Sequence, residues 1–98
     1  MFCVVYQFDV KPGMDDQFRS AWRQMTEIIY DSKGSLGSRL HRLSDQIYIA
    51  YAQWPERALW VDESPLPSSA DEPRQQMRDA CSKIETLLEL DVVDDLLK

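Results

Sequence analysis

The sequence predicts an α+β fold of the ferredoxin-like type, with elements in the order strand, helix, strand, strand, helix, strand. Three observations predict it: an alternating apolar stretch at the N-terminus, an apolar repeat at helical spacing after a Lys-Pro-Gly turn, and two strand-like runs separated by a short polar turn. The 98 residues, 44% of them hydrophobic, are enough for one domain with one core. We therefore expect residues 1–98 to form a single domain.

The N-terminal third predicts a strand followed by a long helix. From Phe2 to Val10, every second residue is apolar and falls on one face, as in a half-buried strand. Residues 11–13 form a turn, and two aspartates follow where the first turn of a helix favours negative charge. The helix is expected to begin near Met14 and to end at Gly34. Its apolar stripe should face the sheet, while Arg19 and Arg23 take the other side.

The remaining sequence predicts a hairpin, a second helix and a last strand. The runs Leu36 to Leu43 and Ile47 to Trp54 flank a short polar turn, which indicates an antiparallel hairpin, and residues 56–62 fit a short helix. Ser69 and Glu72 have the spacing of a capping box. Apolar residues from Met77 to Leu88 then recur at helical spacing, so a helix is expected there. Residues 88–97 would form the final strand, with a frayed helical tail as the alternative.

This order of elements places both helices on one face of the sheet and leaves the other face open to water. Val5 and Val93 are apolar positions expected on the open face. A second copy of the chain is the simplest cover. We therefore expect a homodimer.

Composition argues against several classes of partner and site. The 17 acidic residues outnumber the 11 basic ones, for a net charge of −6, so neither nucleic acid nor an anionic membrane surface is an expected partner. No apolar run approaches the roughly 20 residues of a membrane span, and the N-terminus lacks the features of a secretory signal, so a cytoplasmic location is expected. Cys3, Cys81 and the lone His41 do not make a metal site, and both cysteines are expected to be buried apolar residues.

An ordered set of segments resembles the antibiotic biosynthesis monooxygenase domain family. These segments are the Lys-Pro-Gly turn at 11–13, Phe18 and Trp22 in the first helix, residues 34–42, and residues 51–60. The resemblance runs from about Phe2 to Val61, and the last third matches only in the order of its elements. It implies a dimeric α/β barrel, in which two ferredoxin-like sheets close on each other, with a pocket between sheet and helices in each subunit.

Two functions are compatible with this resemblance. The first is a small cofactor-independent monooxygenase acting on an aromatic or quinol-like small molecule; the alternative is a non-catalytic dimeric module that binds a small molecule or serves assembly. Haem is not expected, because the haem-degrading members use a histidine from the second half of the domain and this chain has none after His41. No Gly-rich phosphate loop for flavin or nicotinamide is present, so no cofactor is implied.

Candidate site residues follow from the pocket that the resemblance implies. The expected substrate-binding residues are Tyr6, Trp22, Ser38, Trp54 and Trp60, and the alternative is that these aromatics fill the core and Ser38 is merely tolerated in its strand. His41 is the candidate general base, Arg39 a candidate for stabilising an anion, and Tyr51 joins them as a candidate catalytic residue. The alternatives are a surface or interface position for His41 and an ion pair with a partner subunit for Arg39.

Overall fold

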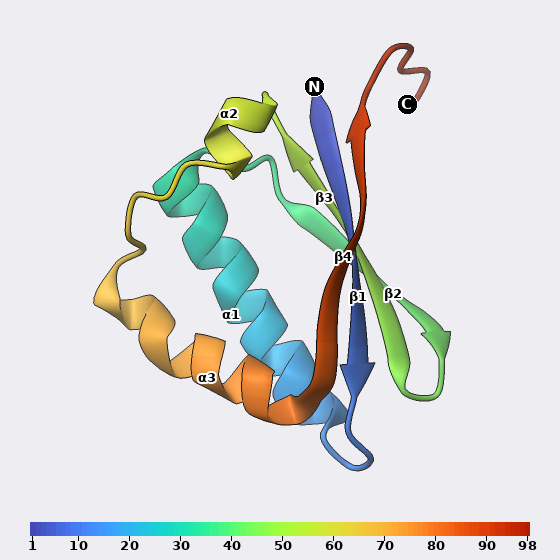
Figure 1. Cartoon of the computed structure of the whole chain (residues 1–98), viewed down its shortest axis with the longest axis vertical. Coiled ribbons are helices and arrows are strands. Elements are labelled where there is room, and N and C mark those ends of the chain that lie inside the picture. The colour runs from blue at the N-terminus through green and yellow to red at the C-terminus, as the bar shows by residue number, and fades with distance from the viewer.

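The computed structural model describes residues 1–98 as one four-stranded antiparallel sheet with the helices on one of its faces (Figure 1). The predicted ferredoxin-like topology is confirmed, and the strand order is β2-β3-β1-β4. Along the chain the elements are β1 (Phe2–Val10), α1 (Asp15–Lys33), β2 (Ser38–Ser44), β3 (Ile47–Trp54), α2 (Arg57–Trp60), η1 (Ser68–Ala70), α3 (Asp71–Ala80) and β4 (Cys81–Asp91).

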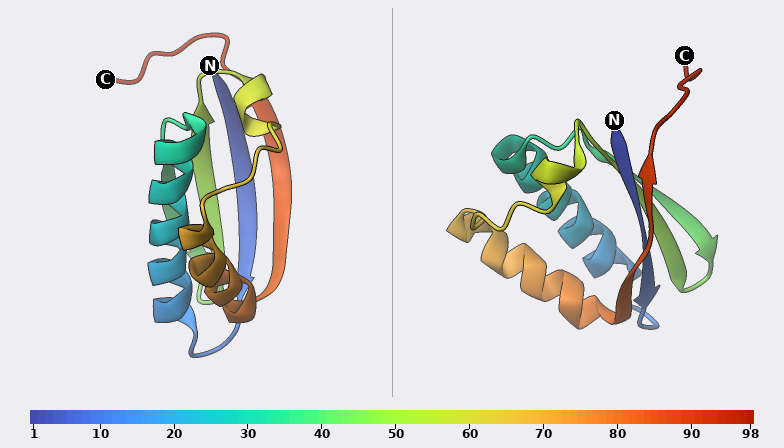
Figure 2. Two further views of the ribbon diagram at one scale, coloured as in Figure 1. Left: turned by 90° about the vertical axis from the view of Figure 1, so that its left-hand side faces the viewer. Right: turned by 45° about the horizontal axis from the view of Figure 1, so that its top comes forward.

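Strand β1 lies at the centre of the sheet, between β3 and β4. Its alternation follows the prediction: Phe2, Val4, Phe8 and Val10 are buried on the face that the helices cover. The other face of the sheet, which carries Val5, has no helix against it (Figure 2). No helix of the chain combines the length and apolar character that crossing a bilayer requires.

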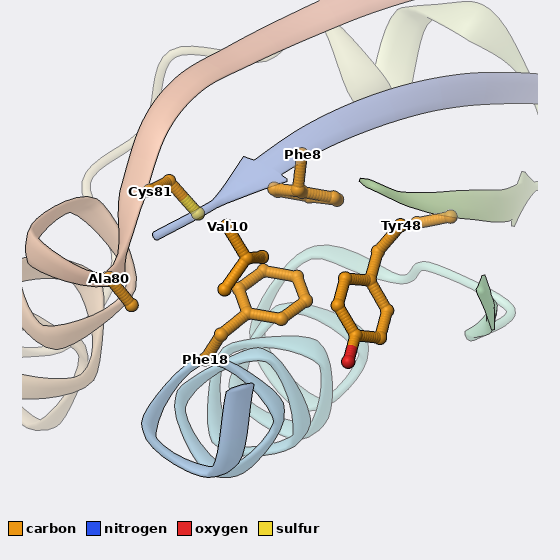
Figure 3. Close-up of a cluster of buried hydrophobic side chains, with 7 residues drawn as sticks. Phe8, Val10, Phe18, Tyr48, Ala80 and Cys81 are labelled. Atoms are coloured by element: carbon orange, nitrogen blue, oxygen red, sulfur yellow. The ribbon is translucent and has the colours of Figure 1, made fainter. Parts of the chain in front are cut away.

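Helix α1 packs on the sheet through Phe18, which is 0% exposed. The Phe18 ring centroid lies 5.0 Å from that of Phe8 and 5.1 Å from that of Tyr48, so one helical side chain contacts two neighbouring strands (Figure 3). As predicted, the helix carries acids in its first turn and ends before Gly34, whose φ of 76° is left-handed. The helix is therefore anchored near its N-terminus and capped at its C-terminus.

The hairpin of β2 and β3 is confirmed, with Ile47–Trp54 as predicted and β2 beginning at Ser38 rather than at Leu36. The predicted short helix is α2, and its Leu59 and Trp60 pack against a cluster of Phe2, Val4 and Trp54. Segment 55–62 thus closes one end of the space between the sheet and α1.

The prediction for the last third was wrong in its boundaries. Helix α3 ends at Ala80, and residues 81–91, which were expected to be largely helical, form β4 along the whole of β1. The expected final strand began at Leu88, seven residues too late, and Val93 lies beyond the strand with 88% of its surface exposed. Ser69 makes no capping hydrogen bond, because α3 begins two residues later and runs on from the turn η1.

The error has a physical cause. β4 is an edge strand, so most of its side chains are exposed and its apolar alternation is weak. Leu87 and Leu88 are also adjacent in the sequence, which imitates helical spacing. In the strand, a register shift between Val5 and Tyr6 leaves Leu87 without a partner on β1. In the folded chain, residues 81–91 form a strand because they pair with β1 and satisfy its backbone hydrogen bonds on the edge that β3 does not occupy.

We expect Phe18→Ala to lower the free energy of unfolding by about 3–5 kcal/mol, because it leaves a cavity where two strands meet α1. Tyr30→Ala is the matched control, because it removes an aromatic ring from the same helix at a position that is 43% exposed. It should lower the free energy of unfolding much less. Denaturant melts of the two variants measure the difference. Equal losses of stability would show that Phe18 is not the main anchor of α1.

Candidate functional site

A cavity of about 230 Å³ lies between the sheet and the helices. Helix α1, strands β1, β3 and β4, and helix α3 all contribute side chains, and nine of the 12 lining residues are hydrophobic. The lining residues are Tyr6, Phe8, Trp22, Met25, Thr26, Ile29, Ser35, Ser38, Ala52, Trp54, Met77 and Ile84. A mostly apolar concavity with a few polar groups is the usual form of a small-molecule site.

The cavity arises where the sheet offers small side chains to α1. Ser38 of β2 and Ala52 of β3 are paired in register, and both line the cavity. At the other end of the helix the corresponding space is filled by Phe18, Phe8 and Tyr48. The hollow is therefore a consequence of side-chain volume along two adjacent strands.

Four of the five predicted substrate-binding residues line this cavity, namely Tyr6, Trp22, Ser38 and Trp54. The fifth, Trp60, stands behind Tyr6: its indole N–H donates a hydrogen bond to the Tyr6 hydroxyl over 2.7 Å. Sequence reasoning missed Thr26 and Ser35, which supply two further hydroxyls. Thr26 follows Trp22 by four residues, a spacing that shares a helix face and offered a signal.

Tyr6 is the polar centre of the cavity wall. Burial raises the pKa of the Tyr6 phenol, the hydrogen bond from Trp60 acts in the opposite direction, and the charge of Glu89 raises it further. The phenol is therefore protonated at neutral pH. Since its oxygen accepts the bond from Trp60, its own O–H is free to donate to a bound molecule.

Trp54 brings an unusual feature to the same wall. Its indole N–H is buried and has no hydrogen-bond acceptor in the protein. Leaving a buried donor without a partner costs about 1–3 kcal/mol. Such exceptions are rare and call for an explanation, and one explanation is an acceptor that arrives with a ligand.

The three candidate catalytic residues lie elsewhere in the subunit. Arg39 pairs with Tyr51 in the register of β2 and β3, and His41 pairs with Ile49, so all three candidates belong to the open face. The His41 Nδ1 lies 3.1 Å from the Ile49 carbonyl oxygen, and the Tyr51 hydroxyl lies 2.9 Å from the Cys3 sulfur. That hydrogen bond, and burial after it, raise the pKa of Tyr51. The sheet separates these residues from Tyr6 and Trp54, although Arg39 and His41, on the edge strand, also line a groove next to the cavity. Their proposed roles stay predictions.

A second, more polar groove of about 500 Å³ runs along the outside of the cavity wall, between α1 and the edge strand β2. It is lined by Arg19, Trp22 and Arg23 of α1, residues 38–42 of β2, and Tyr48 of β3. Trp22 and Ser38 belong to both the groove and the cavity. The two hollows are therefore neighbours with a shared wall.

The chemistry available in the cavity is limited and specific. Its lining contains no carboxylate and no imidazole, so its polar groups are hydroxyls and the indole N–H groups of two tryptophans. The Ser35 and Ser38 hydroxyls already donate to backbone carbonyl oxygens. It can enclose an apolar ring, exclude water from one side of it, and donate hydrogen bonds to an oxygen that bears negative charge. No group of three or more His, Cys, Asp or Glu side chains is arranged to hold a metal ion.

Solved structures share this fold over nearly the whole chain. Rv0793 from Mycobacterium tuberculosis aligns with a TM-score of 0.72 and 15% identity, covering 98% of each chain. SnoaB from Streptomyces nogalater, a cofactor-independent oxygenase, aligns with a TM-score of 0.71 and 17% identity, covering 99% of this chain and 97% of its own. At these identities the likeness shows the fold alone.

Sequence comparison gives the family. No curated protein matches the chain in sequence. The profile of the family described as antibiotic biosynthesis monooxygenase matches residues 1–62, a span that holds β1, α1, the hairpin and α2 and contributes ten of the 12 residues of the cavity wall. The chain belongs to the antibiotic biosynthesis monooxygenase family.

Proposed function

We propose that the protein is a cofactor-independent monooxygenase that oxidises an aromatic or quinol-like small molecule in the cavity between sheet and helices. Its family and fold support a monooxygenase of this type. The observation that carries the proposal is the Tyr6 hydroxyl, which is oriented by Trp60 and free to donate into a mostly apolar cavity. A hydrogen-bond donor fixed in an apolar site is suited to a phenolate oxygen.

The proposed reaction needs a substrate that is itself easily deprotonated. The phenolate is electron-rich and reduces O2 at a ring C–H carbon; one oxygen atom becomes a new ring carbonyl, and the other leaves as water with the hydrogens of that C–H and of the phenol. Tyr6 holds the phenolate oxygen, and the apolar wall excludes water from the reacting ring. Because no base lines the cavity, the acidity of the substrate has to supply the anion.

The alternative is a dimeric module of the same fold that binds a small molecule without turnover. An enclosed cavity with at least two converging polar groups favours the enzyme, whereas a core filled by the tryptophans favours the module. The wall of the cavity of about 230 Å³ carries the hydroxyls of Tyr6 and Thr26, which supports the enzyme. The hydroxyls of Ser35 and Ser38 also line it but donate to backbone carbonyls. Trp22 and Trp54 border this space rather than fill it.

Oxygen uptake with hydroquinones and anthrone-like compounds tests the proposal. Purified protein should consume O2 with an active compound in the absence of any added cofactor, and Tyr6→Phe should lower turnover by about 10² to 10³-fold, as for loss of one fixed donor to a developing anion. Tyr30→Phe removes the same hydroxyl from an exposed position on α1 and should leave turnover unchanged. Binding of these compounds without oxygen uptake would favour the non-catalytic module.

Trp54→Phe separates a binding role from a purely structural one. The variant keeps an aromatic ring and removes the buried N–H that lacks an acceptor, so we expect it to retain the fold and to weaken binding of the active compound. If Trp54 is only a core residue, the change should lower stability by roughly 1 kcal/mol or more and leave turnover per folded molecule unaltered. The melting temperature and oxygen uptake of the same preparation distinguish the two results.

We further propose that two subunits pair through the open face of the sheet. Val5 lies on this face with Leu88 as its β4 partner, and Leu88 is 52% exposed in the single chain. Exposed apolar surface of this kind commonly marks an interface. The face also carries Arg39, His41 and Tyr51, so a second copy would change the surroundings of all three candidates.

Sedimentation should therefore give twice the chain mass of 11.4 kDa at micromolar concentration. The melting temperature should rise with protein concentration, because association stabilises only the folded state. Leu88→Glu should shift the protein towards the monomer, whereas Tyr30→Glu on the opposite side of the molecule should not. A wild-type protein that sediments as a monomer contradicts the proposal.

A further inference from the structure

The groove beside the cavity is strongly basic in a chain that is acidic. Four of the 11 basic residues, all of them arginines, line it, and no aspartate or glutamate does. The net charge of the chain is −6, so this concentration of positive charge is local. The three ion pairs of the structure join Lys33 to Asp62, Arg57 to Glu89 and Lys83 to Glu85, and none involves the groove.

The four arginines differ in how free they are. Arg42 donates a hydrogen bond to the Tyr48 hydroxyl over 3.0 Å, and that hydroxyl donates in turn to Asp15. Arg39 belongs to the open face by its register. Arg19 and Arg23 remain: both are exposed on α1, and no hydrogen bond or ion pair with another side chain is found for either.

Arg19 and Arg23 are four residues apart, so their side chains leave the same face of α1. Two like charges at this spacing destabilise a helix. Trp22 lies between these two arginines in the sequence, and its side chain lines both the groove and the cavity. Because the cavity and the groove share Trp22 and Ser38, a bound molecule that extended past Trp22 would reach two guanidinium groups that have no side-chain partner. An anionic group there would relieve their repulsion.

From this geometry we propose that the substrate is an aromatic acid, whose ring occupies the cavity and whose carboxylate is held at the groove by Arg19 and Arg23. This inference rests on the proposed function, and it specifies the substrate class of the same site. Guanidinium groups suit a carboxylate because their planar donors match its two oxygens. The apolar cavity selects the ring, and the arginines select the charge.

A matched pair of fluorescent probes tests the inference on the whole 98-residue chain. 8-Anilinonaphthalene-1-sulfonate is anionic, and N-phenyl-1-naphthylamine has the same aromatic frame without the charge; the sulfonate stands in for the carboxylate. Arg19→Gln/Arg23→Gln should weaken binding of the anionic probe by about tenfold, which corresponds to loss of about one charge-assisted hydrogen bond. Binding of the neutral probe should not change. Added salt should weaken binding of the anionic probe alone.

Arg74→Gln/Arg78→Gln is the matched control, because it removes two arginines at the same spacing from α3, outside both hollows. It should leave both affinities unchanged. Ala52→Leu places a larger side chain in the cavity and should weaken the binding of both probes. That result would show that both probes bind in the cavity. Arg19 and Arg23 are exposed on the helix surface, so the circular dichroism spectrum of the double variant should match that of the wild type.

The outcomes distinguish this inference from the function on which it rests. If the neutral probe binds and the Arg19/Arg23 variant holds the anionic probe as tightly as the wild type, the aromatic acid is wrong and the cavity remains a ligand site. If neither probe binds in a way that Ala52→Leu alters, the cavity is not a ligand site and both proposals fail. If the Arg74→Gln/Arg78→Gln control lost as much affinity for the anionic probe as the Arg19/Arg23 variant, the effect would come from net charge, and the inference would be overturned.

Discussion

The packing of Phe18 against Phe8 and Tyr48 is the contact on which the rest of the structure depends. It joins α1 to two adjacent strands near the N-terminal end of the helix and so sets the distance between the helix and the sheet. Farther along α1 the strands offer Ala52 and Ser38 instead of aromatic rings. The helix cannot move closer to fill that space without breaking the Phe18 contacts, and the cavity is the result.

The same sheet separates two chemical environments. Side chains of β1 and β3 alternate between the helix-covered face, which holds Tyr6 and Trp54, and the open face, which holds Tyr51. On β2 the alternation sends Ser38 to the cavity and Arg39 to the other side. A residue next to the cavity in the sequence is therefore not necessarily next to it in space, and the polar groups that face the cavity are few.

Two hydrogen-bond donors on the cavity wall, those of Tyr6 and Trp54, have no acceptor in the protein, whereas the Ser35 and Ser38 hydroxyls donate to backbone carbonyl oxygens. Trp60 satisfies the oxygen of Tyr6 and leaves its O–H free, while the N–H of Trp54 has no acceptor at all. Both donors are of the kind that stabilises a negatively charged oxygen in surroundings where water does not compete. The basic groove on the other side of Trp22 also favours a negatively charged group, and Trp22 lines both the groove and the cavity.

The sequence alone determined β1, α1, β3 and the ferredoxin-like order, because strong alternation, helical spacing and the turn residues at 11–13 and Gly34 act over short distances. It also identified Tyr6, Trp22 and Trp54 as neighbours, since each lies on the buried face of its own element. Only the tertiary structure decided the extent of β4, whose weak pattern becomes a strand by pairing with β1. It likewise decided that the sheet separates Arg39, His41 and Tyr51 from Tyr6 and Trp54, and that Arg19 and Arg23 line the groove next to the cavity. Strand register and the approach of α1 to β2 depend on contacts between residues far apart in the chain.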